Sequence, residues 1–250
     1  MIEIHRHLGI RFAEPPTGGR RWQPPAYVAG AASLGHWPAD CPQPRGASPT
    51  RAPGQDEDCL FLNVWSPTDD PDAGLPVLVW FYGGSFLFGS ASDPTGDGEQ
   101  LARRGAVVVT ANYRVGLLGS LAHPGLTAES PYGSSGNYGL LDNLAALRWV
   151  ADHIDRYGGD PGRITAFGVS AGSASLALLQ TSPLAEGSFQ RLVLQSPGAW
   201  RPLASLPEAE AGAVAAYGND VDAMRAWSPC RSLRRRAHDR GRQPRRGGAR

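Results

Sequence analysis

The residue best suited to chemistry in this sequence is Ser170, which stands in the pattern Gly-x-Ser-x-Gly between Gly168 and Gly172. An apolar run typical of a strand precedes the pattern, and an Ala- and Leu-rich run typical of a helix follows it. This context favours a serine nucleophile on a tight strand–helix turn, which needs small residues on both sides. The amide of Ala171 would then point at a developing oxyanion. The alternative is a small-residue helix start that only allows close packing on the strand.

A second segment could serve the same chemistry. The letters WFYGGSF (residues 80–86) complete the apolar run VLVWF and open a glycine-rich loop. Glycines let a backbone amide approach a substrate oxygen without an intervening side chain, and acyl-transfer enzymes stabilise their oxyanion with such amides. The alternative is that Gly-Gly after a strand is simply a turn. The presence of both segments in one chain favours a single site.

The apolar pattern predicts an α/β fold with a largely parallel sheet. Runs such as VLVWF and VVVT are apolar without alternation, as expected for strands covered on both faces. Residues 8–58 contain many prolines and glycines and are predicted to be loop. The expected strands are residues 60–65, 77–82, 107–112, 164–168 and 192–195, and the expected helices are residues 137–157, 170–180 and 208–217.

Three cysteines occur in the chain. Cys41 and Cys59 lie in a stretch rich in Pro, Gly and Ser, and Cys230 is left over. The spacing of the first two is compatible with a disulfide loop, although spacing alone favours two buried thiols.

The order of these motifs resembles the type-B carboxylesterases, the family that includes the cholinesterases. The resemblance extends over residues 8–199 and implies an α/β-hydrolase fold with helices on both faces of the sheet. It is carried by GIRFAEPP, EDCLFLNVWSP, PVLVWFYGGSF, NYRVGLLGSL, GNYGLLDNLAALRWV, YGGDPGRITAFGVSAGS and LVLQSPGA, in that order.

The resemblance implies roles for individual residues. Ser170 aligns with the nucleophile of the family and Ala171 with its amide donor at the turn. Gly84 and Ser85 align with two glycines that donate the other oxyanion hydrogen bonds. Ser85 replaces a glycine, but only its amide is needed, so the donor is kept if the φ angle allows.

Two further pairs follow from the resemblance alone. Cys41 and Cys59 match the first disulfide of the family, and Arg114 and Asp160 match a buried ion pair that braces the loops around the site. The resemblance implies a small-molecule carboxylic ester as substrate, and we expect no metal ion and no cofactor.

Two departures from the family pattern narrow the range of substrates that we expect. The residue before the nucleophile is commonly an acid, and here it is Val169, which makes the pocket more apolar. The stretch between the two cysteines contains no Trp, so the aromatic platform that binds choline is missing. A cholinesterase is therefore not expected.

The base and the acid of a serine hydrolase are not found in the sequence. In this fold they follow the serine, in the order acid and then histidine. The one histidine after Ser170 is His238, in an Arg-rich end without a motif. Loss of a triad member typically lowers kcat about 10⁴- to 10⁶-fold. We therefore expect a carboxylesterase by family that lacks the C-terminal part of its fold and has little or no activity.

The character of the sequence changes after Trp227. We expect a partial hydrolase domain over residues 1–227 and a disordered Arg-rich tail over residues 228–250. The composition of the tail favours a sequence translated out of frame over a basic arm that binds nucleic acid or membrane. All 24 cationic residues are arginine, and nine fall in residues 231–250. Residues 1–230 contain the other 15 arginines and 22 acidic residues. This part of the chain is therefore mildly acidic and is not expected to bind nucleic acid.

Two other functions were weighed. A catalytically dead adhesion module is disfavoured because such relatives lose the serine. An RNA-binding protein is disfavoured because the tail lacks the aromatic residues that stack on bases. No apolar run approaches the roughly 20 residues that span a bilayer, and the first residues do not form a signal peptide. We therefore expect no membrane association and a cytoplasmic location for the chain as written, with its oligomeric state undetermined.

Overall fold

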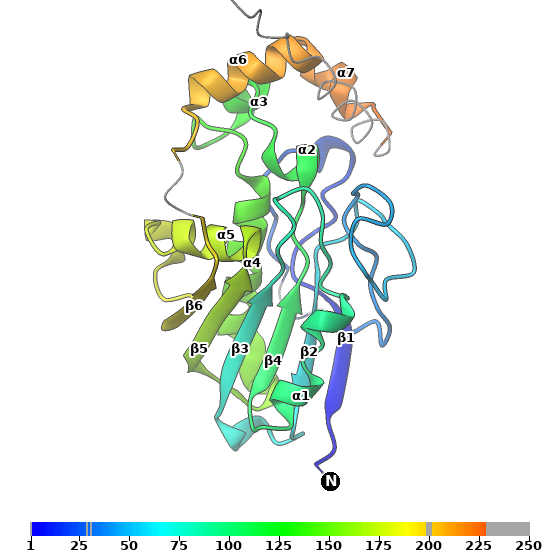
Figure 1. Ribbon diagram of the computed structural model, residues 1–250, viewed down its shortest axis with the longest axis vertical. Coiled ribbons are helices and arrows are strands. Elements are labelled where there is room, and N and C mark those ends of the chain that lie inside the picture. The colour runs from blue at the N-terminus through cyan, green and yellow to red at the C-terminus, as the bar shows by residue number, and fades with distance from the viewer. Residues whose placement is uncertain (1, 29, 31, 199–201, 229–250) are drawn as a thin grey trace, which may run out of the picture.

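Six strands form one sheet in the order β1-β2-β4-β3-β5-β6 (Figure 1). The structure is a computed structural model that describes residues 2–28, 30, 32–198 and 202–228. The pairs β1–β2 and β2–β4 are antiparallel, and the other three pairs are parallel. The strands are β1 (His5–Arg11), β2 (Phe61–Ser66), β3 (Leu75–Phe81), β4 (Val107–Ala111), β5 (Gly159–Val169) and β6 (Arg191–Gln195).

The five expected strands and the mostly parallel sheet are confirmed, but β1 lies partly in a segment predicted to be loop. Its residues show no regular alternation between exposed and buried positions, so it lacks the pattern of a half-buried strand. The strand forms because its backbone pairs with β2, with a register irregularity between His7 and Ile10. The amide of Gly9 at this irregularity donates to Oδ1 of the buried Asn63 at 3.0 Å.

Helices lie on both faces of the sheet. The long helix α4 and the helix α5 pack on β5 on one face, and α1 contacts β4 and β2 on the other (Figure 1). The three expected helices are confirmed as α4, α5 and α6. The helices are α1 (Glu99–Ala102), α2 (Gly116–Ser120), α3 (Pro124–Glu129), α4 (Tyr138–His153), α5 (Ala171–Leu179), α6 (Leu206–Tyr217) and α7 (Val221–Arg225).

The core has two main parts. The larger one lies between the sheet and α4 and α5, and includes Val79, Ala166 and Leu147, all fully buried. The smaller one joins α6 and α7 to α2 and α3 at one end of the molecule (Figure 1). Among the described residues, no helix is long and apolar enough to cross a membrane.

The loop between β1 and β2 is closed by a disulfide between Cys41 and Cys59, whose Cα atoms are 5.0 Å apart. This is the pairing that the family resemblance implied. The Arg-rich tail lies, apart from residue 228, outside the described residues. The boundary at residue 227 stays a prediction.

Candidate active site

Ser170 occupies the turn between β5 and α5, in a backbone conformation that few residues other than glycine adopt (φ 52°, ψ −116°). Its amide donates to the carbonyl oxygen of Gln195 at 2.9 Å, and its own carbonyl accepts from the amide of Ala174 at 2.8 Å. Such a conformation typically costs about 1–3 kcal/mol and persists only where the surroundings impose it. The side chain of Ser170 is exposed.

The two glycines of the motif are required by contact with the neighbouring strand β3. A Cβ on Gly172 would lie 2.2 Å from the carbonyl oxygen of Phe81 and 2.5 Å from that of Tyr82. A Cβ on Gly168 would lie 2.9 Å from the same Phe81 oxygen. The motif therefore lets α5 begin directly against the end of β3. This places Ser170 at the carboxyl end of β5.

The glycine-rich loop lies beside Ser170, as the sequence predicted. A Cβ built on Gly83 would be 3.3 Å from Cβ of Ser170 and 3.3 Å from Cγ1 of Val169. The next two residues have positive φ angles, 112° at Gly84 and 55° at Ser85. Ser85 thus has a positive φ angle, a backbone conformation that favours glycine.

Three backbone amides of the two motif segments are candidates for binding a substrate oxygen. Among the described residues, the N–H groups of Gly84, Ser85 and Ala171 take part in no backbone or side-chain hydrogen bond. Ala171 is the first residue of α5, so the partial positive charge of the helix start adds to the local field. Amides in this arrangement can stabilise negative charge that develops on a carbonyl oxygen.

Two buried tyrosines that sequence reasoning missed hold the base of this loop. Tyr82 and Tyr113 stack with ring centroids 4.3 Å apart. Each hydroxyl donates to the other residue's carbonyl oxygen, at 2.9 Å from Tyr82 and 2.8 Å from Tyr113. Burial raises the pKa of both hydroxyls far above the usual 10, so both stay protonated and keep donating. The sequence carried a signal for them, because Tyr82 directly follows β3 and Tyr113 lies two residues after the end of β4.

Gln43 was also missed, and it fixes the far end of the loop. Its Nε2 donates to the carbonyl oxygens of Gly89 at 2.7 Å and Cys41 at 3.1 Å, and its Oε1 accepts from the amide of Gly89 at 2.8 Å. The buried side-chain amide of Gln43 therefore helps to anchor the glycine-rich loop to the disulfide loop. Only its position two residues after Cys41 could have suggested this.

The expected ion pair between Arg114 and Asp160 is wrong. The buried Arg114 binds Asp142 on α4, with Nε–Oδ2 at 2.8 Å and Nη2–Oδ1 at 2.7 Å. The carboxylate of Asp160 accepts instead from the amide of Gly162 at 2.8 Å, in a local turn. Sequence spacing cannot tell which of two acids reaches Arg114, because the choice depends on how α4 packs.

The described histidines lie on other segments and do not bond Ser170. His123 accepts from the Gly125 amide at Nδ1 and bonds the Gly218 carbonyl oxygen through Nε2. His153 contacts the Trp149 carbonyl oxygen, and His36 that of Trp37. His5 and His7 lie on β1 at the opposite edge of the sheet from β6. Within the described residues, no histidine forms a hydrogen bond to Ser170, and His238 lies outside them.

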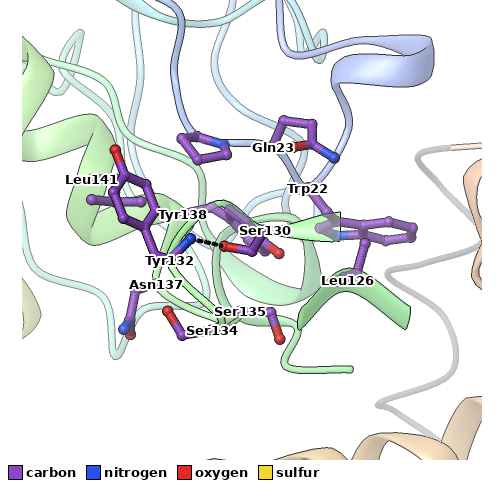
Figure 2. A pocket seen from close by; sticks show the side chains of 11 residues that line it. Trp22, Gln23, Leu126, Ser130, Tyr132, Ser134, Ser135, Asn137, Tyr138 and Leu141 are labelled. Atoms are coloured by element: carbon purple, nitrogen blue, oxygen red, sulfur yellow. Dashed lines mark hydrogen bonds between the residues drawn. The ribbon is translucent and has the colours of Figure 1, made fainter. Parts of the chain in front are cut away.

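A small, partly open cavity lies between the N-terminal loop and the segment that leads into α4, and Ser170 does not line it (Figure 2). Its volume of about 30 Å³ suits one or two water molecules. Figure 2 shows the lining side chains, among which the amide of Tyr132 donates to Oγ of Ser130 at 3.2 Å. The lining residues are Trp22, Gln23, Pro24, Leu126, Ser130, Tyr132, Ser134, Ser135, Asn137, Tyr138 and Leu141.

Comparison with known proteins gives a consistent result. The sequence model described as the Carboxylesterase family matches residues 2–225. The chain is 52% identical over 227 residues to the fumonisin B1 esterase of Sphingopyxis macrogoltabida. This match covers 89% of the chain and 42% of that protein. It is 43% identical over 200 residues to the para-nitrobenzyl esterase of Bacillus subtilis, and this match covers 77% of the chain and 40% of that protein.

A solved structure confirms the fold. The carboxylesterase of Geobacillus stearothermophilus superposes with a TM-score of 0.83 at 38% identity, over 93% of this chain and 49% of that one. The expected α/β-hydrolase fold is thus confirmed. The chain spans about half of that structure and 40–42% of the two relatives above.

Proposed function

Since this chain belongs to the carboxylesterase family, we propose that Ser170 is the nucleophile of carboxylic ester hydrolysis through an acyl-enzyme. The observation that carries the proposal is the approach of the glycine-rich loop to Ser170, marked by the 3.3 Å between a Cβ on Gly83 and Cβ of Ser170. This approach supports a site in which the serine hydroxyl and the backbone amides would act on one carbonyl group, as acyl transfer requires.

The proposed reaction begins when Oγ of Ser170 attacks the ester carbonyl carbon. Negative charge then moves to the carbonyl oxygen, where the amides of Gly84, Ser85 and Ala171 would donate hydrogen bonds. The alcohol leaves as the acyl–serine ester forms, and water then hydrolyses that ester. A base must take the serine proton in the first step and return it to the leaving alcohol.

We propose that this chain by itself turns over esters very slowly, because no described histidine bonds Ser170. Without a base, the serine hydroxyl is a poor nucleophile. The amides would still lower the barrier, so a small Ser170-dependent rate can remain.

The proposed substrates are small carboxylic esters with apolar groups near the nucleophile. Val169 is half-buried beside Ser170 and offers no charge to a cationic alcohol. The names of the two relatives, fumonisin B1 esterase and para-nitrobenzyl esterase, agree with an ester as substrate.

Chemical rescue tests the proposal. Imidazole, added as a free base, should increase hydrolysis of p-nitrophenyl acetate by the purified chain above the rate with Ser170→Ala, and mass spectrometry should find the acetyl group on Ser170. Ser134→Ala, which removes another exposed serine hydroxyl, should behave like the unaltered chain. Equal imidazole-dependent rates with and without Ser170 would show that the proposal is wrong.

A further inference from the structure

A groove with a volume of about 430 Å³ lies along one side of α4, and Ser170 does not line it. The other lining residues come from the N-terminal loop, from the loop before α4 and from the segment after α5. Segments far apart in the sequence therefore enclose a hollow of the size that small ligands occupy. The helix lines the groove with residues spaced three and four apart, which share one side of a helix: Leu141, Leu144, Ala145, Arg148 and Asp152.

Large apolar side chains around this groove are open to solvent. Tyr27 is 45% exposed, Tyr132 is 65% exposed and Leu184 is 46% exposed. Single exposed apolar side chains are common on protein surfaces, but several around one hollow are typical of a binding site. Tyr132 and Leu141 also line the small cavity of Figure 2, so the groove and that cavity adjoin. The two tyrosine rings offer flat faces that suit an aromatic group.

Arg148 brings a positive charge with unused hydrogen-bond donors to the groove. Its Nη2 donates to the carbonyl oxygen of Leu184 at 2.7 Å, which holds the guanidinium in place. Among the described residues, its Nε and Nη1 form no hydrogen bond, and the side chain forms no ion pair. A guanidinium with two adjacent free N–H groups is the geometry that binds a carboxylate.

The acidic residue of the groove, Asp152, already has a partner. Its Oδ2 accepts from the hydroxyl of Tyr27 at 2.9 Å. Partial burial, together with this bond, raises the pKa of Tyr27 to about 12, so the hydroxyl stays protonated and keeps donating. Arg148 is therefore the charged group of the groove whose donors are open to a ligand, and the charge that it favours is negative.

We propose that this groove binds an aromatic carboxylate, with the ring against Tyr27, Tyr132 and Leu184 and the carboxylate on Nε and Nη1 of Arg148. The apolar lining would remove the ring from water, and Arg148 would fix its orientation. Small-molecule sites commonly combine a mostly apolar wall with a few polar groups in this way. The proposal concerns a site that does not include Ser170, so it does not rest on the proposed function.

Binding of 2-naphthoate to the purified chain, measured by ligand-detected NMR and calorimetry, tests the proposal. The control ligand is 2-naphthamide, which has the same ring without the charge. The chain should bind naphthoate at least tenfold more tightly than naphthamide, because a charge-assisted bond to a guanidinium is stronger than a neutral one. Absence of naphthoate binding, or equal affinities for the two ligands, would overturn the proposal.

Arg148→Met tests the contact with the carboxylate, because it keeps a long apolar side chain and removes the charge. It should lower the affinity for naphthoate at least tenfold and leave that for naphthamide unchanged. Arg163→Met is the matched control, since the exposed Arg163 also donates to a carbonyl oxygen, that of Gly74 at 2.9 Å, but does not line the groove. It should change neither affinity. Unchanged naphthoate binding by Arg148→Met would overturn the proposal.

Three further variants keep the test decisive if Arg148→Met folds poorly, as judged by its urea unfolding midpoint. Asp152→Asn should increase the affinity for naphthoate several-fold, because it removes a negative charge near the bound carboxylate. Tyr132→Ala, at an exposed side chain, should weaken both ligands. Ser170→Ala should bind naphthoate as the unaltered chain does. Loss of binding in Ser170→Ala would place the ligand at the candidate active site and overturn the groove, whatever the role of Ser170 in hydrolysis.

Discussion

The amide of Ser170 and the carbonyl oxygen of Gln195 form a 2.9 Å hydrogen bond that ties the end of β5 to the end of β6. This bond helps to hold Ser170 at a φ of 52°, a conformation that the serine would not keep in a free chain. Because the acceptor is a backbone oxygen, the support comes from the pairing of the two strands and not from the Gln195 side chain. The geometry of the candidate nucleophile therefore depends on an intact sheet edge.

Substitution of Gly172 by alanine should destabilise the protein by about 3 kcal/mol, in the range for forced overpacking. The new Cβ would lie 2.2 Å from the Phe81 carbonyl oxygen, and neither backbone segment can move without opening the turn. Gly212→Ala is the matched control, because its Cβ meets nothing within 4 Å on α6. That change should stabilise the protein by about 0.5–1 kcal/mol. Urea unfolding midpoints measure both effects.

Asp142→Asn should cost about 3–5 kcal/mol, since it leaves the charge of Arg114 buried without its partner. Asp160→Asn is the matched control and should cost about 1 kcal/mol or less, because its carboxylate serves a local turn at the surface. The two unfolding free energies should therefore differ clearly. A larger loss from Asp160→Asn would restore the pairing that the sequence suggested.

Reduction of the Cys41–Cys59 disulfide should lower the unfolding free energy by about 3 kcal/mol, the amount expected for a loop of this length. The bond closes a loop with a sequence separation of 18. Thermal unfolding with and without dithiothreitol measures the loss. The doubly substituted Cys41→Ala, Cys59→Ala protein should be insensitive to the reductant, which shows that the effect comes from this bond.

The ion pair of Glu129 and Arg225 should make stability depend on pH. Hydrogen bonding to Arg225 lowers the pKa of Glu129 below its usual 4.5. A lowered folded-state pKa gives a contribution that is present above the unfolded-state pKa and is lost as the pH falls through the folded-state pKa. Glu129→Gln should therefore cost about 1 kcal/mol or less at pH 7, and nothing once the carboxylate is protonated.

Unfolding free energies of both proteins between pH 7 and pH 3 measure this difference. Glu3→Gln, at an exposed position near the N-terminal end, is the control and should have little effect throughout. A difference between Glu129→Gln and the unaltered protein that does not shrink as the pH falls from 7 to 3 would show that the side chain acts by packing and not by charge.

The turn that carries Ser170 could be predicted from the sequence because its requirements are local. Only small residues at Gly168 and Gly172 allow a helix to begin against a strand, and continuous apolar runs mark the strands that surround them. The strand β1 could not be predicted in this way. Its conformation comes from pairing with β2, which lies some 50 residues further along the chain, about the distance from Arg11 to Phe61.

The sequence by itself thus determined the family, the mostly parallel sheet and the place of Ser170 at a strand–helix turn. Only the tertiary structure decided that Asp142, and not Asp160, neutralises Arg114, and that Gln43 and the two tyrosines hold the glycine-rich loop. The physical reason is the range of the interactions. A turn depends on adjacent residues, whereas a buried charge or amide is satisfied by whichever group the packing of distant segments brings within hydrogen-bonding distance.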